Sequence, residues 1–533
     1  MTRFIFITGG VVSSLGKGIV AASMGALLQA HGYQVRIRKM DPYLNVDPGT
    51  MSPLQHGEVF VTEDGAETDL DLGHYERFTG VNATQDDAIT AGSIYQTVIA
   101  QERAGDYLGA TVQVIPHITD EIKHRIQHNT QDEDFVIVET GGTVGDIESL
   151  PFLEAMRQLY MERGAREIMF VHVTLLPWID AAQELKTKPT QHSVRELLGL
   201  GISPHMLVCR TERDLDISIK NKISLFCNVP SHMIITAPNV ENINTVPLRY
   251  HVEGMDEAVL RHFGIDYLPP NLNRWYNIQQ DWLRCQQTQC KVKIGIVGKY
   301  VSLPDSYKSL TQALHHAALK NHQQLEIAWI NSDQDADPLQ QQLNECDGVL
   351  VPGGFGARGI PGKLQAIRYA REHQVPFLGI CLGMQLAVID VIRSAGCMSA
   401  GSTEFGACEP AVVDILPNAG DSMGATMRLG NRTAQLIDNS LISKIYHGNE
   451  IQERHRHRYE VIVTPRIRSM LEKQKCEISA VSTQEQLPEV IEHQQHPWFV
   501  GVQFHPEYKS RCWQPHPVFV SFLAACMNPE NQP

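Results

Sequence analysis

The chain has 533 residues, of which 43% are hydrophobic and 20% are charged, and its formal net charge is −15. This length suggests about three domains, although two large α/β domains would also fit, and the composition excludes fibrous and disordered classes. The acidic balance argues against a protein that binds duplex nucleic acid, because neutralising phosphates requires a basic surface.

The first apolar stretch, residues 4–7, is too short for a signal peptide and predicts a β-strand. No apolar run reaches membrane-spanning length, so we expect no membrane partner and a cytoplasmic location. The 11 cysteines have no framework spacing, which indicates reduced thiols. Cys285 and Cys290 are the only close pair, and they lack the further ligands of a zinc site.

Two segments, residues 4–10 and 292–298, each combine a short β-branched strand with a glycine turn. Apolar runs at residues 135–138, 168–171 and 348–351 recur between amphipathic stretches, which predicts parallel sheets with helical crossovers. We therefore predict an α/β fold with two doubly wound domains. Two prolines and a Gln-rich stretch with Trp275 and Trp282 predict a partly helical connector. The predicted domains are residues 1–267 and 291–533, joined by a linker at 268–290.

A glycine-rich loop, residues 9–19, follows the first predicted strand. Such a loop leading into a helix directs backbone N–H groups at a phosphate, and Lys17 adds a positive charge. Five residues separate Gly10 from Gly16, and Gly18 replaces the Ser or Thr that binds magnesium in a standard P-loop. A glycine turn without phosphate is the ordinary alternative, but the lysine and the preceding strand favour phosphate binding.

The missing magnesium ligand has candidates elsewhere in the chain. Glu67, Asp69 and Asp71 lie in one short segment, and Glu139 directly follows the predicted strand 135–138. Magnesium takes one or two protein carboxylates and keeps water ligands. We predict that Asp71 and Glu139 are the ligands.

Residues 186–191, Lys-Thr-Lys-Pro-Thr-Gln, combine two cations with hydroxyl and amide groups. Alternate side chains of an extended segment face the same way, so Lys186 and Lys188 are predicted to hold one triphosphate. A solvated loop is the ordinary alternative.

Cys381 lies between two glycines directly after an apolar run, which is the pattern of a nucleophile elbow. The turn is predicted to expose the sulfur at a helix N-terminus. His505 would serve as base and acid, Glu507 would orient it, and residues 353–356 would complete an oxyanion hole. A buried structural cysteine is the alternative. It would leave the cysteine turn, the glycine loop and the His-Pro-Glu run together without an explanation.

Residues 454–459 read Arg-His-Arg-His-Arg-Tyr. Two histidines suggest a metal site, but the interleaved arginines would repel a cation. We predict that this run binds an anion or a carboxylate.

Several of these runs resemble a known family. Residues 9–18, 39–53, 65–76 and 186–191 resemble the synthase half of the CTP synthase family. Residues 379–385, 402–405, 454–459 and 505–507 resemble its class I glutamine amidotransferase half. The resemblance covers nearly the whole chain and implies an N-terminal P-loop amidoligase domain of the dethiobiotin synthetase type.

The resemblance implies an enzyme that uses ATP to phosphorylate O4 of UTP. Ammonia from glutamine, released through a thioester on Cys381, then displaces the phosphate to give CTP. It also implies Mg²⁺ as cofactor, inhibition by CTP, activation by GTP, and homotetramers that assemble into filaments in some members. Ala104 stands where the family pattern has a basic residue, and residues 238–240 replace a more charged segment.

The resemblance also assigns roles to individual positions. The catalytic residues would be Cys381, His505 and Glu507, and the metal ligands Asp71 and Glu139. The ATP-binding residues would be Ser14, Leu15, Gly16, Lys17, Gly18, Ile19, Asp71, Pro238, Asn239 and Val240. The residues for UTP or CTP would be Ser13, Asp146, Ile147, Glu148, Lys186, Thr187, Lys188, Pro189, Thr190, Gln191 and Lys222. The glutamine-binding residues would be Gly354, Leu382, Gly383, Met384, Gln385, Glu404 and Arg458.

Two rival functions remain. One is a P-loop amidotransferase that amidates a carboxylate, which would not need the lysines of residues 186–191. The other is a nucleotide-sensing assembly protein with an inactive thiol domain, which would not need Cys381, His505 and Glu507 together.

Overall fold

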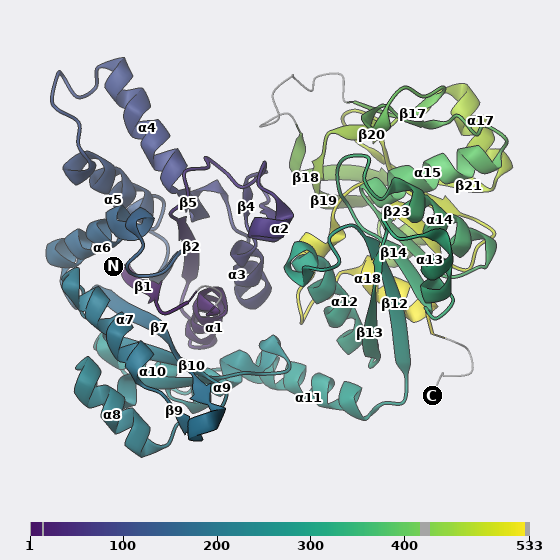
Figure 1. Ribbon diagram of the computed structural model, residues 1–533. Helices are drawn as coiled ribbons and strands as arrows, with labels where there is room; N and C mark the ends of the chain where they lie inside the picture. The colour runs from purple at the N-terminus through teal and green to yellow at the C-terminus, as the bar shows by residue number, and fades with distance from the viewer. Residues whose placement is uncertain (1, 13–14, 416–426, 528–533) are drawn as a thin grey trace. The chain divides into compact units, whose positions relative to one another are not determined.

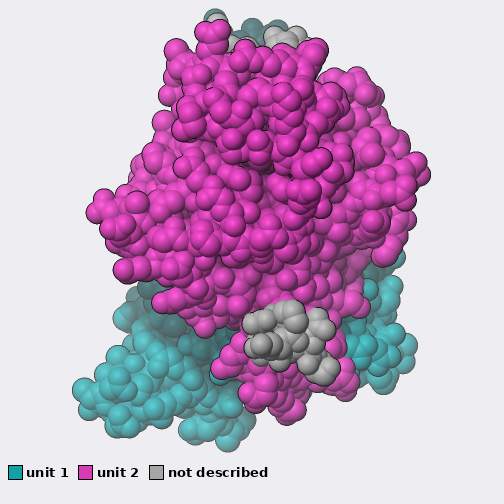
Figure 2. All heavy atoms as spheres, turned by 90° about the vertical axis from the view of Figure 1, so that its right-hand side faces the viewer, with its two compact units in different colours: residues 1–48, 71–279 teal, residues 49–70, 280–533 magenta. Residues whose placement is uncertain are grey.

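The computed structural model describes residues 2–12, 15–415 and 427–527. The chain forms two compact units, coloured separately in Figure 2. Unit 1 contains Met1–Pro48 and Asp71–Gln279, and unit 2 contains Gly49–Leu70 and Gln280–Pro533. The short segment Gly49–Leu70 therefore packs with the C-terminal part of the chain. Within the described ranges, every helix is too short or too polar to cross a membrane.

The core of unit 1 is a seven-stranded parallel sheet (Figure 1). Its strands, in spatial order, are β11 (Ile234–Pro238), β10 (Met206–Thr211), β7 (Ile168–Leu176), β1 (Arg3–Gly9), β6 (Phe135–Thr140), β2 (Val35–Asp41) and β5 (Ala88–Thr90). β1 pairs with β6 on one side and β7 on the other, so the strand order reverses at β1. Ligands of such sheets bind beyond the carboxyl ends of the strands at this reversal.

Helices cover both faces of this sheet because its strands are apolar on both faces. Phe4 and Phe6 of β1 pack in one cluster with residues of α4 (Ala91–Ala104), α5 (Thr119–Gln127) and α6 (Leu150–Arg163). Ile5 and Ile7 are buried on the other face, and α1 (Lys17–Ala30) contacts β2 and β6. The remaining elements of unit 1 are α3 (Asp71–Thr79), the hairpin β8 (Trp178–Ile179) and β9 (Glu184–Leu185), α7 (Lys188–Gly199), α8 (Ile217–Cys227), α9 (Val246–Val252) and α10 (Met255–His262).

Unit 2 contains a nine-stranded sheet. Its order is β13 (Gln324–Asn331), β12 (Lys291–Gly298), β14 (Gly348–Val351), β15 (Phe377–Ile380), β23 (Phe499–Val502), β22 (Pro488–His493), β21 (Cys476–Ser482), β18 (Arg428–Leu436) and β19 (Glu450–His457). The strands from β13 to β23 are parallel, as predicted, but the others are antiparallel. β21 and β22 are joined by a short connection without a crossover helix, which permits antiparallel pairing. The sequence prediction of a doubly wound sheet missed this change.

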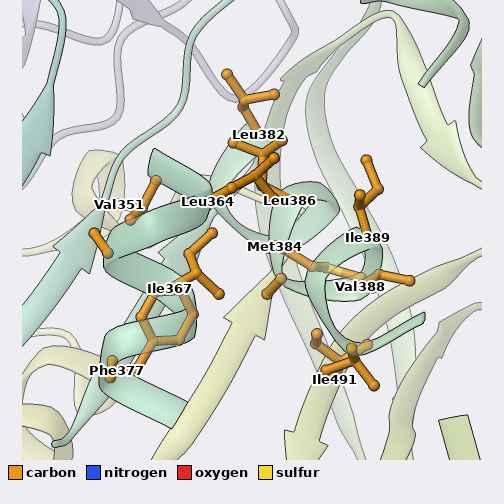
Figure 3. Packing of buried hydrophobic residues seen from close by; sticks show 14 of the residues in the cluster. Val351, Leu364, Ile367, Phe377, Leu382, Met384, Leu386, Val388, Ile389 and Ile491 are labelled. Atoms are coloured by element: carbon orange, nitrogen blue, oxygen red, sulfur yellow. The ribbon is translucent and has the colours of Figure 1, made fainter. Parts of the chain in front are cut away.

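Two hydrophobic clusters lie on opposite faces of this sheet. One includes residues of α13 (Ala336–Leu343), α14 (Ile360–Glu372), α15 (Leu382–Ser394) and α17 (Pro465–Lys473), and Figure 3 shows some of its side chains. The other includes α12 (Lys308–Lys320), α16 (Leu441–Tyr446) and α18 (Pro517–Ala525). A small sheet is formed by β16 (Gly401–Ser402), β17 (Ala411–Ile415) and β20 (Tyr459–Val461). Segment Gly49–Leu70 contributes α2 (Pro53–His56), β3 (Val59–Val61) and β4 (Glu67–Asp69).

The predicted connector is helical. It contains α11 (Asn273–Gln287), and the boundary of the two units falls within this helix. Trp275 is buried, with its ring 5.5 Å from that of Phe78 in unit 1.

Candidate active sites

The predicted phosphate loop joins β1 to α1. Gly16 precedes the helix with φ of 83°, a left-handed conformation that glycine adopts without strain. Lys17 begins α1, and its amino group donates to the carbonyl oxygen of Gly142. Burial lowers the pKa of Lys17, although Glu139 acts in the opposite direction. Ser13 and Ser14, which were predicted to bind UTP and ATP, lie outside the described residues.

Gly18 leaves room for a carboxylate. A Cβ atom at this position would stand 2.2 Å from Oδ1 of Asp71, the first residue of α3. The Asp71 carboxylate therefore occupies the space in which a Ser or Thr side chain of a standard P-loop would begin. This packing accounts physically for the glycine that follows Lys17.

Lys39 on β2 joins the two predicted metal ligands. Its amino group donates to Oδ2 of Asp71 and, at 3.0 Å, to Oε1 of Glu139. The other oxygen of Glu139 accepts the hydroxyl of Tyr75. Burial and the Asp71 charge raise the pKa of Glu139, whereas Lys39 offsets burial at Asp71 and lowers its pKa. The partly exposed carboxylate of Asp71 and the buried carboxylate of Glu139 thus converge on one cation.

The donor set of Asp71 and Glu139 fits Mg²⁺. This ion usually takes one or two protein carboxylates and completes its shell with phosphate and water oxygens. In the described ranges of the chain, no group of three or more His, Cys, Asp or Glu side chains is arranged to hold a metal. Nucleotide phosphates and water would therefore supply the other ligands. Glu67 and Asp69, the other candidates, belong to unit 2.

The predicted triphosphate-binding segment is not extended. Its second half, from Lys188, forms the first turn of α7, and Thr190 donates through Oγ1 to the carbonyl oxygen of Leu175 at 3.0 Å. The expected alternation of Lys186 and Lys188 along a strand is therefore wrong. Pro189 favours this outcome, since proline is well suited to the first turn of a helix. The segment instead combines two lysines with a helix N-terminus, an arrangement that favours anions.

Other predicted nucleotide contacts follow strands of the same sheet. Asp146, Ile147 and Glu148 are exposed in the loop after β6, where the amide of Thr143 donates to Oδ2 of Asp146 at 2.8 Å. Pro238 ends β11, and Oδ1 of Asn239 accepts from Arg210 at 2.9 Å, whereas Val240 has no side-chain hydrogen-bonding group. Lys222 is exposed on α8, which follows β10. The parallel order of the strands places these loops at the edge that carries the phosphate loop.

His172 on β7 supports the phosphate loop and was not predicted. Its Nδ1 lies 2.8 Å from Oγ1 of Thr8, and its Nε2 lies 2.7 Å from Oγ of Ser193. Burial lowers the pKa of His172 to about 3, so the ring is neutral and joins β1 to α7. A histidine within an apolar strand gives no sequence signal for this role.

In unit 2, Cys381 has the predicted elbow geometry. It joins β15 to α15 with φ of 53° and ψ of −105°, which is a strained conformation for a residue with a side chain. The neighbouring glycines are required, because a Cβ at Gly379 would stand 2.7 Å from the backbone of Gly383. A Cβ at Gly383 would stand 2.1 Å from the carbonyl oxygen of Val351.

The sulfur of Cys381 is covered, contrary to the prediction that the turn exposes it. The residue is 3% exposed, and its Sγ lies 3.8 Å from the carbonyl oxygen of Arg456 and 3.7 Å from Nε2 of Gln503. Residues of β19 and of the segment after β23 enclose the thiol. Spacing along the sequence contains no information about this cover.

His505 and Glu507 complete the predicted triad. Nδ1 of His505 lies 2.7 Å from Oε1 of Glu507. A Cβ at Gly353 would stand 3.5 Å from both Nε2 of His505 and Cβ of Cys381, so these side chains meet beside that glycine. Burial lowers the pKa of His505, but Glu507 and the hydrogen-bonded thiol raise it overall to about 10. The imidazolium is thus stabilised beside the sulfur.

The glycine loop at residues 353–356 is held at two points. Its Gly356 amide donates to Oε1 of Glu404 at 2.6 Å, and Lys299 donates to the carbonyl oxygen of Phe355. Lys363, on α14, lies beneath the loop, with Nζ 3.7 Å from where a Cβ of Gly354 would stand. The loop therefore lies beside the thiol with few side chains of its own.

Because side chains alternate along a strand, the histidines and the arginines of the Arg-His run face opposite sides of β19. His455 and His457 are buried, with Nδ1 of the first 2.9 Å from Nε2 of the second. Arg454 donates to Oε1 of Glu63 at 3.1 Å, and Arg456 donates to Oε1 of Glu67 at 2.8 Å. Two carboxylates of the chain itself thus pair with these arginines, and binding of a separate anion or carboxylate stays a prediction. Both paired carboxylates lie in segment Gly49–Leu70.

The comparisons with known proteins cover both parts of the chain. Residues 3–265 match the family model described as CTP synthase N-terminus, and residues 302–525 match glutamine amidotransferase class-I. The CTP synthase of Paramagnetospirillum magneticum is 56% identical over 540 residues and is aligned over 99% of each chain. The chain belongs to the CTP synthase family.

Two further proteins are similar to the chain. The CTP synthase of Gluconacetobacter diazotrophicus is 55% identical over 542 residues, again with 99% of each chain covered. A solved structure of the Trypanosoma brucei CTPS glutaminase domain with bound acivicin is 38% identical, covering 44% of this chain and 93% of that chain, with a TM-score of 0.42. As a member of the CTP synthase family, the chain is a ligase with a class I glutamine amidotransferase domain.

The remaining residues that are predicted to bind glutamine in this CTP synthase family member lie near the elbow. Leu382, Gly383, Met384 and Gln385 form the first turn of α15, and Leu382 and Met384 belong to the hydrophobic cluster of Figure 3. Nε2 of Gln385 donates to the carbonyl oxygen of Tyr459 at 2.9 Å. Arg458 is half-buried between β19 and β20.

Some residues at these sites were missed by sequence reasoning. They include Lys39, Tyr75 and His172 in unit 1, and Gln503 and Tyr508 in unit 2. The sequence did contain one signal for the pairing of segment Gly49–Leu70 with residues 454–458. The first is rich in acidic residues, and the second contains three arginines of opposite charge.

Proposed function

We propose that this chain converts UTP to CTP with ATP and glutamine, through a UTP phosphorylated at O4. The observation that supports the proposal most directly is that each unit contains its own set of candidate active-site residues. Unit 1 has a phosphate loop with paired carboxylates, and unit 2 has a Cys-His-Glu triad behind a glycine loop. The family membership supports the choice of substrates.

The triad supports hydrolysis of the glutamine side chain through a thioester. His505 takes the proton of Cys381, and the sulfur forms a bond to the amide carbon. The C–N bond breaks as His505 returns the proton to the leaving nitrogen, and ammonia departs. Water then attacks the thioester and releases glutamate. The imidazolium that carries the proton is stabilised by Glu507.

The phosphate loop supports activation of UTP. An oxide is a poor leaving group, so transfer of a phosphoryl group to O4 prepares the ring for displacement by ammonia. Lys17 and the N–H groups at the start of α1 would hold the transferred phosphate. Mg²⁺, held by Asp71 and Glu139, would supply charge neutralisation when bound. Lys39 keeps the two carboxylates together.

The predicted nucleotide contacts extend this proposal. ATP would use residues 14–19 and the loop 238–240, and UTP would use Ser13, residues 186–191 and Lys222. CTP would share the triphosphate contacts and add residues 146–148, so product inhibition follows from competition. Activation by GTP, assembly into tetramers and filaments, and a cytoplasmic location are further parts of the proposal.

Two substitutions test the two chemistries separately. Cys381→Ala is expected to abolish CTP formation from glutamine while CTP formation from added ammonia continues. Lys17→Ala is expected to abolish CTP formation from either nitrogen source while glutamine hydrolysis continues. Measuring CTP and glutamate in both variants checks these outcomes.

The same assays decide between the rivals. Loss of ammonia-dependent synthesis in Cys381→Ala contradicts the division into two sites. Failure of the parent chain to consume UTP favours an amidotransferase that acts on a carboxylate. Failure of the parent to release glutamate from glutamine favours a nucleotide-sensing protein with an inactive thiol domain.

A further inference from the structure

Segment Gly49–Leu70 forms part of the wall of a cavity beside the thiol site. The cavity has a volume of about 170 Å³. The segment contributes Gly49, Pro53 and Glu58 to its lining, and the glutaminase residues Gly353, His505 and Glu507 also line it. A cavity of this size holds several molecules as small as ammonia, since a water in the liquid takes about 30 Å³. It lies against the imidazole that protonates the leaving nitrogen.

Glu58 fastens the segment at this cavity. Its Oε2 accepts the amide of Ser309 at 2.6 Å, and its Oε1 accepts the Ser309 hydroxyl. Ser309 is the second residue of α12, so the carboxylate lies at the positive end of a 13-residue helix. Charge-assisted hydrogen bonds to such a helix end are strong and directional. The amide of Glu58 also donates to the carbonyl oxygen of Asp305 at 3.0 Å.

A second contact links the segment to the catalytic histidine. The hydroxyl of Tyr508 donates to the carbonyl oxygen of Val59 at 3.0 Å. The ring of Tyr508 is stacked on that of His505, with centroids 5.2 Å apart and an interplanar angle of 18°. The segment is therefore held both at the cavity wall and behind the imidazole.

We propose that Glu58 is a positioning residue that keeps segment Gly49–Leu70 closed over this cavity, so that ammonia released at Cys381 is retained for the amination. This inference rests on the proposed function and adds a residue to it. Ammonia must stay unprotonated to attack carbon, and escape to bulk water at neutral pH converts it to ammonium. Loosening the wall is therefore expected to waste nitrogen without stopping either chemical step.

Glu58→Gln and Ser309→Ala test the proposal from both sides of the contact. Each keeps the size of the side chain close to the original but weakens the bond at the helix end. We expect glutamate release and ammonia-dependent CTP formation to stay within about twofold of the parent, while CTP formed per glutamate falls to about half or less. Amide deuterium exchange of β3 is expected to accelerate about tenfold.

A matched control is Glu326→Gln, which removes a carboxylate from an exposed ion pair with Lys293 at 3.0 Å in the same unit. It is expected to leave the ratio of CTP to glutamate and the exchange of β3 unchanged. An unchanged ratio in Glu58→Gln overturns the proposal, whatever the exchange shows. A parallel loss of ammonia-dependent synthesis and thermal stability also overturns it, because it indicates a purely structural role.

The outcome for Glu58 can be separated from that for the proposed function. A parent chain that forms no CTP from UTP and added ammonia overturns the proposed function. In that case, unchanged exchange of β3 in Glu58→Gln still overturns the closing role of Glu58, and accelerated exchange supports it.

Discussion

The carboxylate of Asp71 lies against Gly18, so closely that a Cβ at position 18 would stand 2.2 Å from Oδ1. The carboxylate also accepts a hydrogen bond from the amino group of Lys39, which restricts its movement. A side chain at position 18 must therefore displace Asp71 from the start of α1. In a standard P-loop, a Ser at this position would improve magnesium binding.

Gly18→Ser is accordingly expected to inactivate the synthase chemistry. The displaced Asp71 would no longer converge with Glu139, so CTP formation from added ammonia should fall by about 10²-fold or more. Glutamine hydrolysis by unit 2 serves as the internal control and should continue. Retained or increased CTP formation in Gly18→Ser would contradict the assignment of Asp71 as a metal ligand.

Glu507→Gln is expected to change the pH dependence of glutamine hydrolysis. Burial lowers the pKa of His505, but Glu507 and Cys381 raise it to about 10, so the parent keeps the imidazolium through the neutral range. Removing the Glu507 charge lowers this pKa, and the imidazolium is then lost at lower pH. The alkaline limb of the kcat profile should move down by about one pH unit or more, with a lower maximum.

Glutamate release between pH 6 and 10, measured for parent and variant, checks this shift. Ammonia-dependent CTP formation should be unaffected, because the change is confined to the thiol site. An alkaline limb at the same pH in both proteins would mean that Glu507 does not set the charge of His505.

Local sequence patterns predicted the phosphate loop and the cysteine turn, because the backbone conformation of such turns requires glycine at particular positions. The glycines around Cys381 are required by contacts of 2.7 Å or less at a Cβ position, and such requirements are visible in the sequence. The antiparallel half of the second sheet was not predicted, because parallel and antiparallel strands share the same apolar composition. The bonds from Lys39 to Asp71 and Glu139 join residues up to 100 positions apart and leave no local pattern.

The role of segment Gly49–Leu70 also could not be predicted from local patterns. Its sequence lies between parts of unit 1, yet Glu58, Glu63 and Glu67 bond to residues more than 240 positions away. Which residues pair over such a separation depends on tertiary packing. Secondary-structure propensity and hydrophobic periodicity contain no information about it.

Lys363 is a buried amine that reduces the stability of unit 2 at neutral pH. It is 0% exposed, and within the described part of the chain its Nζ has no hydrogen-bond partner. Burial and the neighbouring Lys299 lower its pKa to about 7 from an ordinary value of 10.5. The unfolded chain therefore binds more protons than the folded chain between these two pH values. The free energy of unfolding should therefore rise with pH across this window. Below pH 7 the amine is charged in both states, and the full cost of burying the charge destabilises the fold.

Lys363→Met, which keeps the shape of the side chain without its charge, is expected to stabilise unit 2 at pH 7 by about 1–4 kcal/mol. The gain should shrink as pH rises toward 10, because removing the proton from the amine of the unfolded chain then costs less free energy. Calorimetric unfolding at pH 7 and pH 10 measures both effects, and Leu364→Met on the same helix controls for the added methionine. A Lys363→Met variant less stable than the parent at pH 7 would show that the amine has a stabilising partner, which its burial beneath the glycine loop argues against.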